Sequence, residues 1–168
     1  DIYHIDDIVS RVNAALCRDT LDNEFATLWY GVIDTEKLRL TYCSGGHEPP
    51  MIFRAVKGRP PAAADIDELS IGGMAVGIDP SQRYQRGTYD LHPGDVFLAY
   101  TDGVTDMLNF ERKKFGKARL RQTILQLLTQ EPGASAGRIT DHLFWELRQF
   151  GGILERPDDQ TVVIARVK

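Results

Sequence analysis

The sequence is poor in cysteine, has no long apolar run and carries no excess of basic residues. Its 168 residues include 2 cysteines, Cys17 and Cys43, too few for a disulfide framework. Reduced thiols in a cytosolic protein are the simpler interpretation. No apolar stretch approaches the roughly 18 residues of a membrane-spanning helix, so no membrane insertion is expected. The net charge of −4 comes without a basic stripe, which argues against a nucleic-acid partner.

The chain opens without an initiator methionine, and no secretory leader is expected. It opens at Asp1, and acidic residues follow at Asp6 and Asp7. We therefore expect a cytoplasmic location and a piece of a longer chain. The content of 42% hydrophobic and 26% charged residues is ordinary for a globular protein with a real core. We expect a single domain over residues 1–168, without internal repeats.

The spacing of apolar residues predicts an α+β fold. Helical periodicity marks residues 6–18, 117–130 and 134–150, the last with Ser135 as a candidate N-cap. The segment 57–69, with glycine, prolines and an alanine run, is expected to be an exposed connection. Strands precede the last two helices, and turn residues join neighbours, which favours antiparallel sheets with outer helices over a parallel βαβ arrangement. The predicted strands are residues 25–33, 38–43, 51–56, 84–91, 96–101 and 161–167.

Two strand ends carry carboxylates. FLAYTDGVTD, residues 97–106, passes from an apolar strand to Asp102 and Gly103, while PDDQTVVIARV, residues 157–167, puts Asp158 and Asp159 before another apolar run. Carboxylate oxygens are the ligands that Mg²⁺ and Mn²⁺ prefer. Gly103 would let the backbone turn sharply and leave room for a hydrated ion or a phosphate. A plain turn and an exposed loop or cap are the simpler interpretations. These residues alone indicate a candidate cation site and no reaction.

The order of four segments resembles the metal-dependent protein phosphatase family (PPM, protein phosphatase 2C-like), in its bacterial SpoIIE-like, RsbU-type branch. The resemblance implies two antiparallel sheets packed face to face with helices on the outer faces, an α/β/β/α sandwich. It covers roughly the C-terminal two-thirds of such a domain, so the sandwich is expected to be N-terminally incomplete. The matching segments are FATLWYGVIDTEKLRLTYCSGGHEPPMI, GGMAVGI, LHPGDVFLAYTDGVTDMLNFERKKFG and PDDQTVVIARV.

The resemblance also implies roles for particular residues. Asp102 and Asp158 occupy positions of metal ligands, in a site that holds two Mn²⁺ or Mg²⁺ ions in the complete domain. Asp159 stands where many relatives carry asparagine, so it would hold the metal ligands in place without binding the ion itself. Thr101 and Gly103 would shape the turn around Asp102. No side-chain nucleophile is implied, because a metal-activated water attacks the phosphorus.

His47 lies in the loop Gly-His-Glu-Pro, which the branch typically writes Gly-His-Asn-Pro. Two roles stay open for it, a loop-fixing hydrogen bond and proton donation, and the first is favoured in a loop rich in glycine and proline.

Two further acidic motifs of the family have no counterpart in residues 1–24. A fragment is therefore expected, with half of the dinuclear site, at most weak binding of one ion and little activity alone. Its Asp102 and Asp158 carboxylates are expected within about 6–7 Å of each other, the span of one hydrated octahedral ion. Missing strands would leave open edges or bare apolar surface, so self-association is expected.

The implied function is hydrolysis of phosphoserine or phosphothreonine in a phosphoprotein substrate during bacterial signalling. An anti-sigma-factor antagonist is the candidate substrate, and a sensory or receiver domain is expected upstream in the parent chain. Two other hypotheses stay open. One is a catalytically silent phosphatase-like domain that binds a partner protein, and the other is a cation site with a purely structural role.

Overall fold

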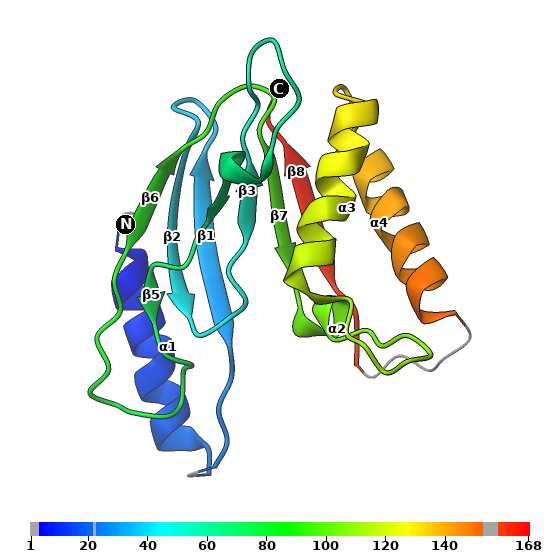
Figure 1. The fold of residues 1–168 in the computed structure, drawn as a ribbon. Helices are drawn as coiled ribbons and strands as arrows, with labels where there is room; N and C mark the ends of the chain where they lie inside the picture. Colours follow the sequence, from blue (N-terminus) through cyan, green and yellow to red (C-terminus); the bar gives the residue numbers. More distant parts are fainter. Residues whose placement is uncertain (1–3, 22, 153–157) are drawn as a thin grey trace. The chain divides into compact units, whose positions relative to one another are not determined.

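The computed structural model describes residues 4–21, 23–152 and 158–168 (Figure 1). The contacts between residues divide the chain into two compact units. The first comprises Asp1–Pro49 and Leu69–Leu91, and the second comprises Pro50–Glu68 and His92–Lys168. Among the described residues, the first unit combines a four-stranded sheet with one helix, and the second combines a four-stranded sheet with several. No helix in the described part of the chain is both long and apolar enough to cross a membrane.

The sheet of the first unit is built around its longest hairpin. Strands β1 (Leu28–Asp34) and β2 (Arg39–Gly45) pair antiparallel, and β6 (Gly87–Asp90) pairs antiparallel with β2. The short strand β5 (Gly72–Gly73) instead runs parallel to β2, an exception of 2 residues within sheets that are mostly antiparallel, as predicted. The missing side chain of Gly72 allows this close pairing, because a Cβ there would lie 1.9 Å from the carbonyl oxygen of Ser44.

The helix α1 (Ile5–Asp19) confirms the helix predicted over residues 6–18, but its buried face differs. The apolar residue Val12 is 37% exposed, while the polar residue Asn13 is buried. The Asn13 side chain donates to the carbonyl of Asp79 at 2.8 Å and accepts from the N–H of Gly77 at 2.8 Å. Asn13 therefore ties α1 to the backbone of residues 77–79, since a buried amide must find such partners.

The sheet of the second unit has the order β4-β3-β7-β8, with antiparallel pairs throughout. Its helices are α2 (Asp102–Thr105), α3 (Gly116–Gln130) and α4 (Ala136–Gly151). Apolar residues of α3 and α4 share one core with those of β3 and β7, so these helices cover the sheet (Figure 1). The strands are β3 (Met51–Phe53), β4 (Ile66–Glu68), β7 (Val96–Tyr100) and β8 (Val162–Arg166).

Both helices predicted near the C-terminal end, over residues 117–130 and 134–150, are confirmed as α3 and α4. The hydroxyl of Ser135 caps α4 by accepting from the N–H of Arg138 at 3.2 Å, as the sequence indicated.

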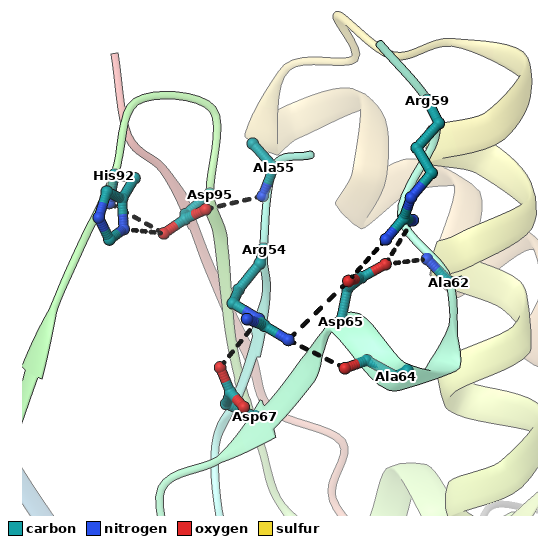
Figure 2. A network of polar contacts seen from close by, with 9 residues as sticks. All are labelled: Arg54, Ala55, Arg59, Ala62, Ala64, Asp65, Asp67, His92 and Asp95. Atoms are coloured by element: carbon teal, nitrogen blue, oxygen red, sulfur yellow. Dashed lines mark hydrogen bonds and ion pairs between the residues drawn. The ribbon is translucent and has the colours of Figure 1, made fainter. Parts of the chain in front are cut away.

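The segment 57–69 is more than the exposed connection that its composition predicts. It contains a 3₁₀ turn, η1 (Ala63–Asp65), and strand β4. The buried Asp65 carboxylate accepts from both ends of the Arg59 guanidinium, at 2.6 and 3.0 Å, and from the N–H of Ala62 at 2.8 Å (Figure 2). Arg54 lies 3.8 Å from the same carboxylate and 3.2 Å from Asp67. Hydrogen bonds and positive charge therefore order this segment without an apolar pattern.

A second buried carboxylate, Asp95, holds the turn between β6 and β7. It accepts from the N–H of Ala55 at 2.7 Å and from that of His92 at 2.9 Å (Figure 2). Gly94 takes a φ of 93°, which this turn requires and which glycine adopts without strain. The His92 side chain is largely exposed, and its Nδ1 lies 3.7 Å from the Asp95 carboxylate.

Candidate functional site

Asp102 lies where β7 gives way to a helix. The strand ends at Tyr100, and α2 begins at Asp102, so the Asp-Gly pair opens a helical turn rather than a plain loop turn. The carbonyl of Asp102 accepts from the N–H of Asp106 at 2.7 Å and from the hydroxyl of Thr105 at 3.1 Å. The backbone at this position is thereby fixed, while the residue stays exposed to solvent.

The second acidic segment is held against the first by the ladder between β7 and β8. Tyr100 pairs with Val162, and the pairing continues one step further through Thr101, whose N–H donates to the carbonyl of Thr161 at 3.1 Å. The Thr101 hydroxyl accepts from the N–H of Thr161 at 3.0 Å and donates to the carbonyl of Asp159 at 3.2 Å. This one side chain therefore joins the backbone next to Asp102 to the backbone of the other acids.

Gly103 serves a purpose that the sequence did not suggest. Its φ lies outside the left-handed region, so conformational freedom is not what the position requires. A Cβ there would lie 2.2 Å from the carbonyl oxygen of Asp159 and 3.3 Å from the carbonyl carbon of Asp158. The room that glycine leaves is filled by the second acidic segment. Gly103 was expected to leave room for a hydrated ion or a phosphate, but the Asp159 backbone occupies that space.

Gln160 completes the contact and was missed by sequence reasoning. Its side-chain amide donates to the carbonyl of Gly103 at 3.1 Å. The only signal in the sequence was a long polar side chain directly after the acid pair, a pattern common to many exposed loops.

The two segments present carboxylates, oxygen donors of the kind that hard divalent cations accept. Asp102, Asp158 and Asp159 are all exposed, and one oxygen of Asp158 accepts from the N–H of Asp159 at 2.7 Å. Within residues 4–21, 23–152 and 158–168, no three histidine, cysteine or acidic side chains are grouped so that they could hold a metal ion. Carboxylate oxygens are the kind of donor that Mg²⁺ or Mn²⁺ binds. A complete coordination shell needs more donors than these carboxylates supply. The separation of the Asp102 and Asp158 carboxylates stays a prediction.

His47 lies in the first unit, in the loop after β2. Its Nδ1 is 3.1 Å from the hydroxyl of Thr27, and it follows Gly46, whose φ is 76°. This contact is what a loop-fixing histidine would make, so it favours the structural role over proton donation.

Solved structures with this fold are PP2C-type phosphatase domains. The SiaA PP2C domain of Pseudomonas aeruginosa matches with a TM-score of 0.74 and 17% identity, over 97% of this chain and 61% of that one. The catalytic domain of the serine/threonine phosphatase PstP, solved with 2 manganese ions, matches with a TM-score of 0.65 and 17% identity, over 100% and 73%. The predicted α+β class of the PPM type is confirmed by these likenesses.

The family described as Stage II sporulation protein E (SpoIIE) matches residues 2–168, and the chain belongs to this family. The phosphoserine phosphatase RsbU of Bacillus subtilis (strain 168) is 22% identical over 165 residues, which cover 98% of this chain and 46% of RsbU. Protein IcfG of Synechocystis sp. is 36% identical over 102 residues, which cover 60% of this chain and 15% of IcfG. The chain thus spans less than half the length of either relative.

Proposed function

We propose that this chain is part of a metal-dependent protein serine/threonine phosphatase that acts on phosphoserine or phosphothreonine in bacterial signalling. The observation that carries the proposal is the clamp between two acidic segments at one end of the β7–β8 ladder. Membership of the SpoIIE family supports it, and so does the name of RsbU, a phosphoserine phosphatase. The reported ions of two structural relatives, manganese in PstP and magnesium in RsbX, favour Mn²⁺ or Mg²⁺ as cofactors.

In this proposal Asp102 and Asp158 hold the metal, and Asp159, Thr101 and Gly103 support them. When bound, such ions supply a water of lowered pKa and positive charge against the phosphoryl oxygens. The chain's own contribution is position. Thr101 fixes the backbone of Asp159 through its hydroxyl, and the missing side chain of Gly103 lets both acidic segments approach. Rigid placement of this kind is what electrostatic catalysis requires.

The substrate is a phosphoprotein, and an anti-sigma-factor antagonist is the specific candidate. A sensory or receiver domain upstream in the parent chain would control access to it. Action in the cytoplasm follows from such a partner.

The test is the substitution Asp102→Asn in the complete parent protein. Asparagine keeps the shape but removes the anion that would hold the cation, so turnover should fall by several orders of magnitude while the fold stays intact. Asp158→Asn should behave likewise. Asp159→Asn should cost less. Asp141→Asn, the same change at an exposed position of α4, is the matched control and should leave turnover unchanged.

The assay follows steady-state hydrolysis of a phosphoserine protein and of an aryl phosphate with added Mn²⁺, beside a melting curve for each variant. Full activity of a folded Asp102→Asn variant at limiting metal would contradict the proposal. A wild-type parent without any activity would point to the silent binding module. The 168 residues alone are expected to show little or no turnover.

A further inference from the structure

The chain forms a tight hairpin directly after α2, here called the basic hairpin (residues 107–115). The N–H of Phe115 donates to the carbonyl of Met107 at 2.8 Å, and the N–H of Asn109 donates to the carbonyl of Lys113 at 3.0 Å. The Asn109 side chain accepts from the N–H groups of Glu111 and Lys113, at 3.0 and 2.9 Å. The tip is therefore held by hydrogen bonds within the hairpin, from its backbone and from the Asn109 side chain.

Helix α4 anchors the same hairpin on one side. A Cβ on Gly151 would lie 1.8 Å from the methyl carbon of Met107, and a Cβ on Gly152 would lie 2.7 Å from the ring of Phe110. Both glycines leave room for side chains of the hairpin at the end of α4. Two apolar contacts thus fix the base and the flank of the hairpin.

The base of the hairpin lies within one helical turn of Asp102. The ammonium group of Lys114 is 2.8 Å from the carboxylate of Asp106, whose N–H donates to the carbonyl of Asp102 at 2.7 Å. A ligand group held at Asp102 would therefore lie near the basic hairpin, which belongs to the same unit.

The hairpin and the start of α3 concentrate positive charge on a chain whose net charge is −4. Residues 111–119 contain one acid, Glu111, among five basic residues. The Lys113 and Lys114 side chains are 74% and 62% exposed, although each also has an acidic neighbour within 2.8 Å. Arg112 is exposed at the tip, with a φ of 56°. The five basic residues are Arg112, Lys113, Lys114, Lys117 and Arg119.

We propose that the basic hairpin is a docking surface for an acidic segment of the phosphoprotein substrate, beside its phosphorylated serine or threonine. The inference rests on the proposed function and adds to it a substrate class, acidic phosphopeptides. Complementary charge speeds encounter and selects partners. A surface already ordered before binding loses little entropy when the peptide arrives. Apolar or neutral peptides lack the charge advantage.

The test uses the full-length parent protein and the double variant Arg112→Gln/Lys113→Gln. Lys57→Gln is the control, because this exposed lysine follows β3 at the Val96 end of β7, opposite to the end that leads to Asp102. The probe is a fluorescein-labelled peptide with a non-hydrolysable phosphoserine analogue between acidic residues, followed by fluorescence anisotropy. A matched peptide has each acid replaced by its amide. Steady-state hydrolysis of an aryl phosphate and of the two phosphoserine peptides is measured in parallel.

The double variant should bind the acidic peptide about 3- to 10-fold more weakly at low salt, and KM for the hydrolysable phosphoserine form of that peptide should rise by the same factor. Added salt should erase most of the difference, since exposed charges are screened. Aryl phosphate hydrolysis, binding of the amide peptide and the control variant should be unchanged. Equal binding of the acidic peptide by wild type and double variant would overturn the docking surface. A double variant that binds a DNA oligonucleotide more weakly than wild type, but binds the acidic peptide equally well, would overturn it too. If wild type hydrolyses none of the substrates but still binds the acidic peptide in a charge-dependent way, the proposed phosphatase function is contradicted and the docking surface is supported.

Discussion

At the scale of single residues, Gly103 and Asp65 show how much depends on one contact. Gly103 lies inside α2, where its lack of a side chain admits the Asp159 carbonyl. Asp65 lies in a segment without an apolar pattern, and its carboxylate gathers two arginines and a backbone N–H. Each residue therefore supports a prediction that local propensity would miss.

We predict that Gly103→Ala destabilises the chain even though alanine favours helices. Helix propensity would gain up to about 1 kcal/mol, but a Cβ at 2.2 Å from a backbone oxygen forces a shift that costs about 1–3 kcal/mol or more. Urea denaturation measures the difference. Gly133→Ala is the matched control, since a Cβ there meets nothing within 4 Å and its φ is not positive. Equal stability of both variants would refute the close approach of the two acidic segments.

The Asp65 carboxylate makes stability depend on pH. The hydrogen bond from Arg59, then that from the N–H of Ala62, and then the charges of Arg59 and Arg54 lower its pKa to about 2. Because the pKa is lower in the folded state, the stabilisation is complete above the ordinary value near 4 and is lost as the pH falls through about 2. The melting temperature of Asp65→Asn should lie below that of wild type by a constant amount from about pH 5 to 7. The gap should close toward pH 2. A gap that widens in acid would contradict this assignment.

At the scale of elements, the helices of the second unit depend on ordinary local signals joined to a shared core. Leu143 on α4 and Ile124 on α3 are fully buried in the same apolar cluster. The strand pair β7–β8 then carries the Thr101 and Asp159 backbones to one end of the sheet. The first turn of α4 is held by the Ser135 cap.

Ser135→Ala should lower the free energy of unfolding by about 1 kcal/mol, because the N–H of Arg138 loses its acceptor. Ser135→Asp should keep most of the stability, since a carboxylate accepts the same bond and suits the helix dipole. Chemical denaturation of the three proteins decides the matter. Alanine and aspartate variants of equal stability would show that the cap contributes nothing.

At the scale of the whole molecule, apolar side chains stand exposed on the last strand of each described sheet. Strand β1 ends one sheet order and exposes Ile33 at 42%, and β8 ends the other and exposes Val163 at 55%. Terminal strands with unpaired backbone groups invite a second chain to pair with them. The expectation of self-association therefore stays a prediction, now with named positions.

The 168-residue chain should sediment with increasing apparent mass as its concentration rises, and Val163→Lys together with Ile33→Lys should reduce that increase. Lysine at an edge opposes pairing through its charge and hydration. Gln122→Lys, which adds the same charge at an exposed position of α3, is the control and should leave sedimentation unchanged. A monomer at every concentration would rule out the expected association.

The sequence by itself determined the three long helices and the acidic segments. Apolar residues at a spacing of 3.6 marked the three long helices within a few residues of their observed ends, because an amphipathic face is written in neighbouring positions. The order of four sequence segments was sufficient to identify the PPM resemblance, which the SpoIIE family match confirms. The assignment of ligands to Asp102 and Asp158 remains a prediction from that resemblance.

Only the tertiary structure decided which distant residues meet. The parallel strand β5, the buried amide of Asn13, the carboxylate of Asp65 and the approach of Asp159 to Gly103 each follow from backbone brought together across the fold. A polar side chain gives no periodic signal of burial, because its partners are single groups placed by other elements. The same holds for the basic hairpin, whose charge is visible in the sequence but whose fixed position beside Asp102 is not.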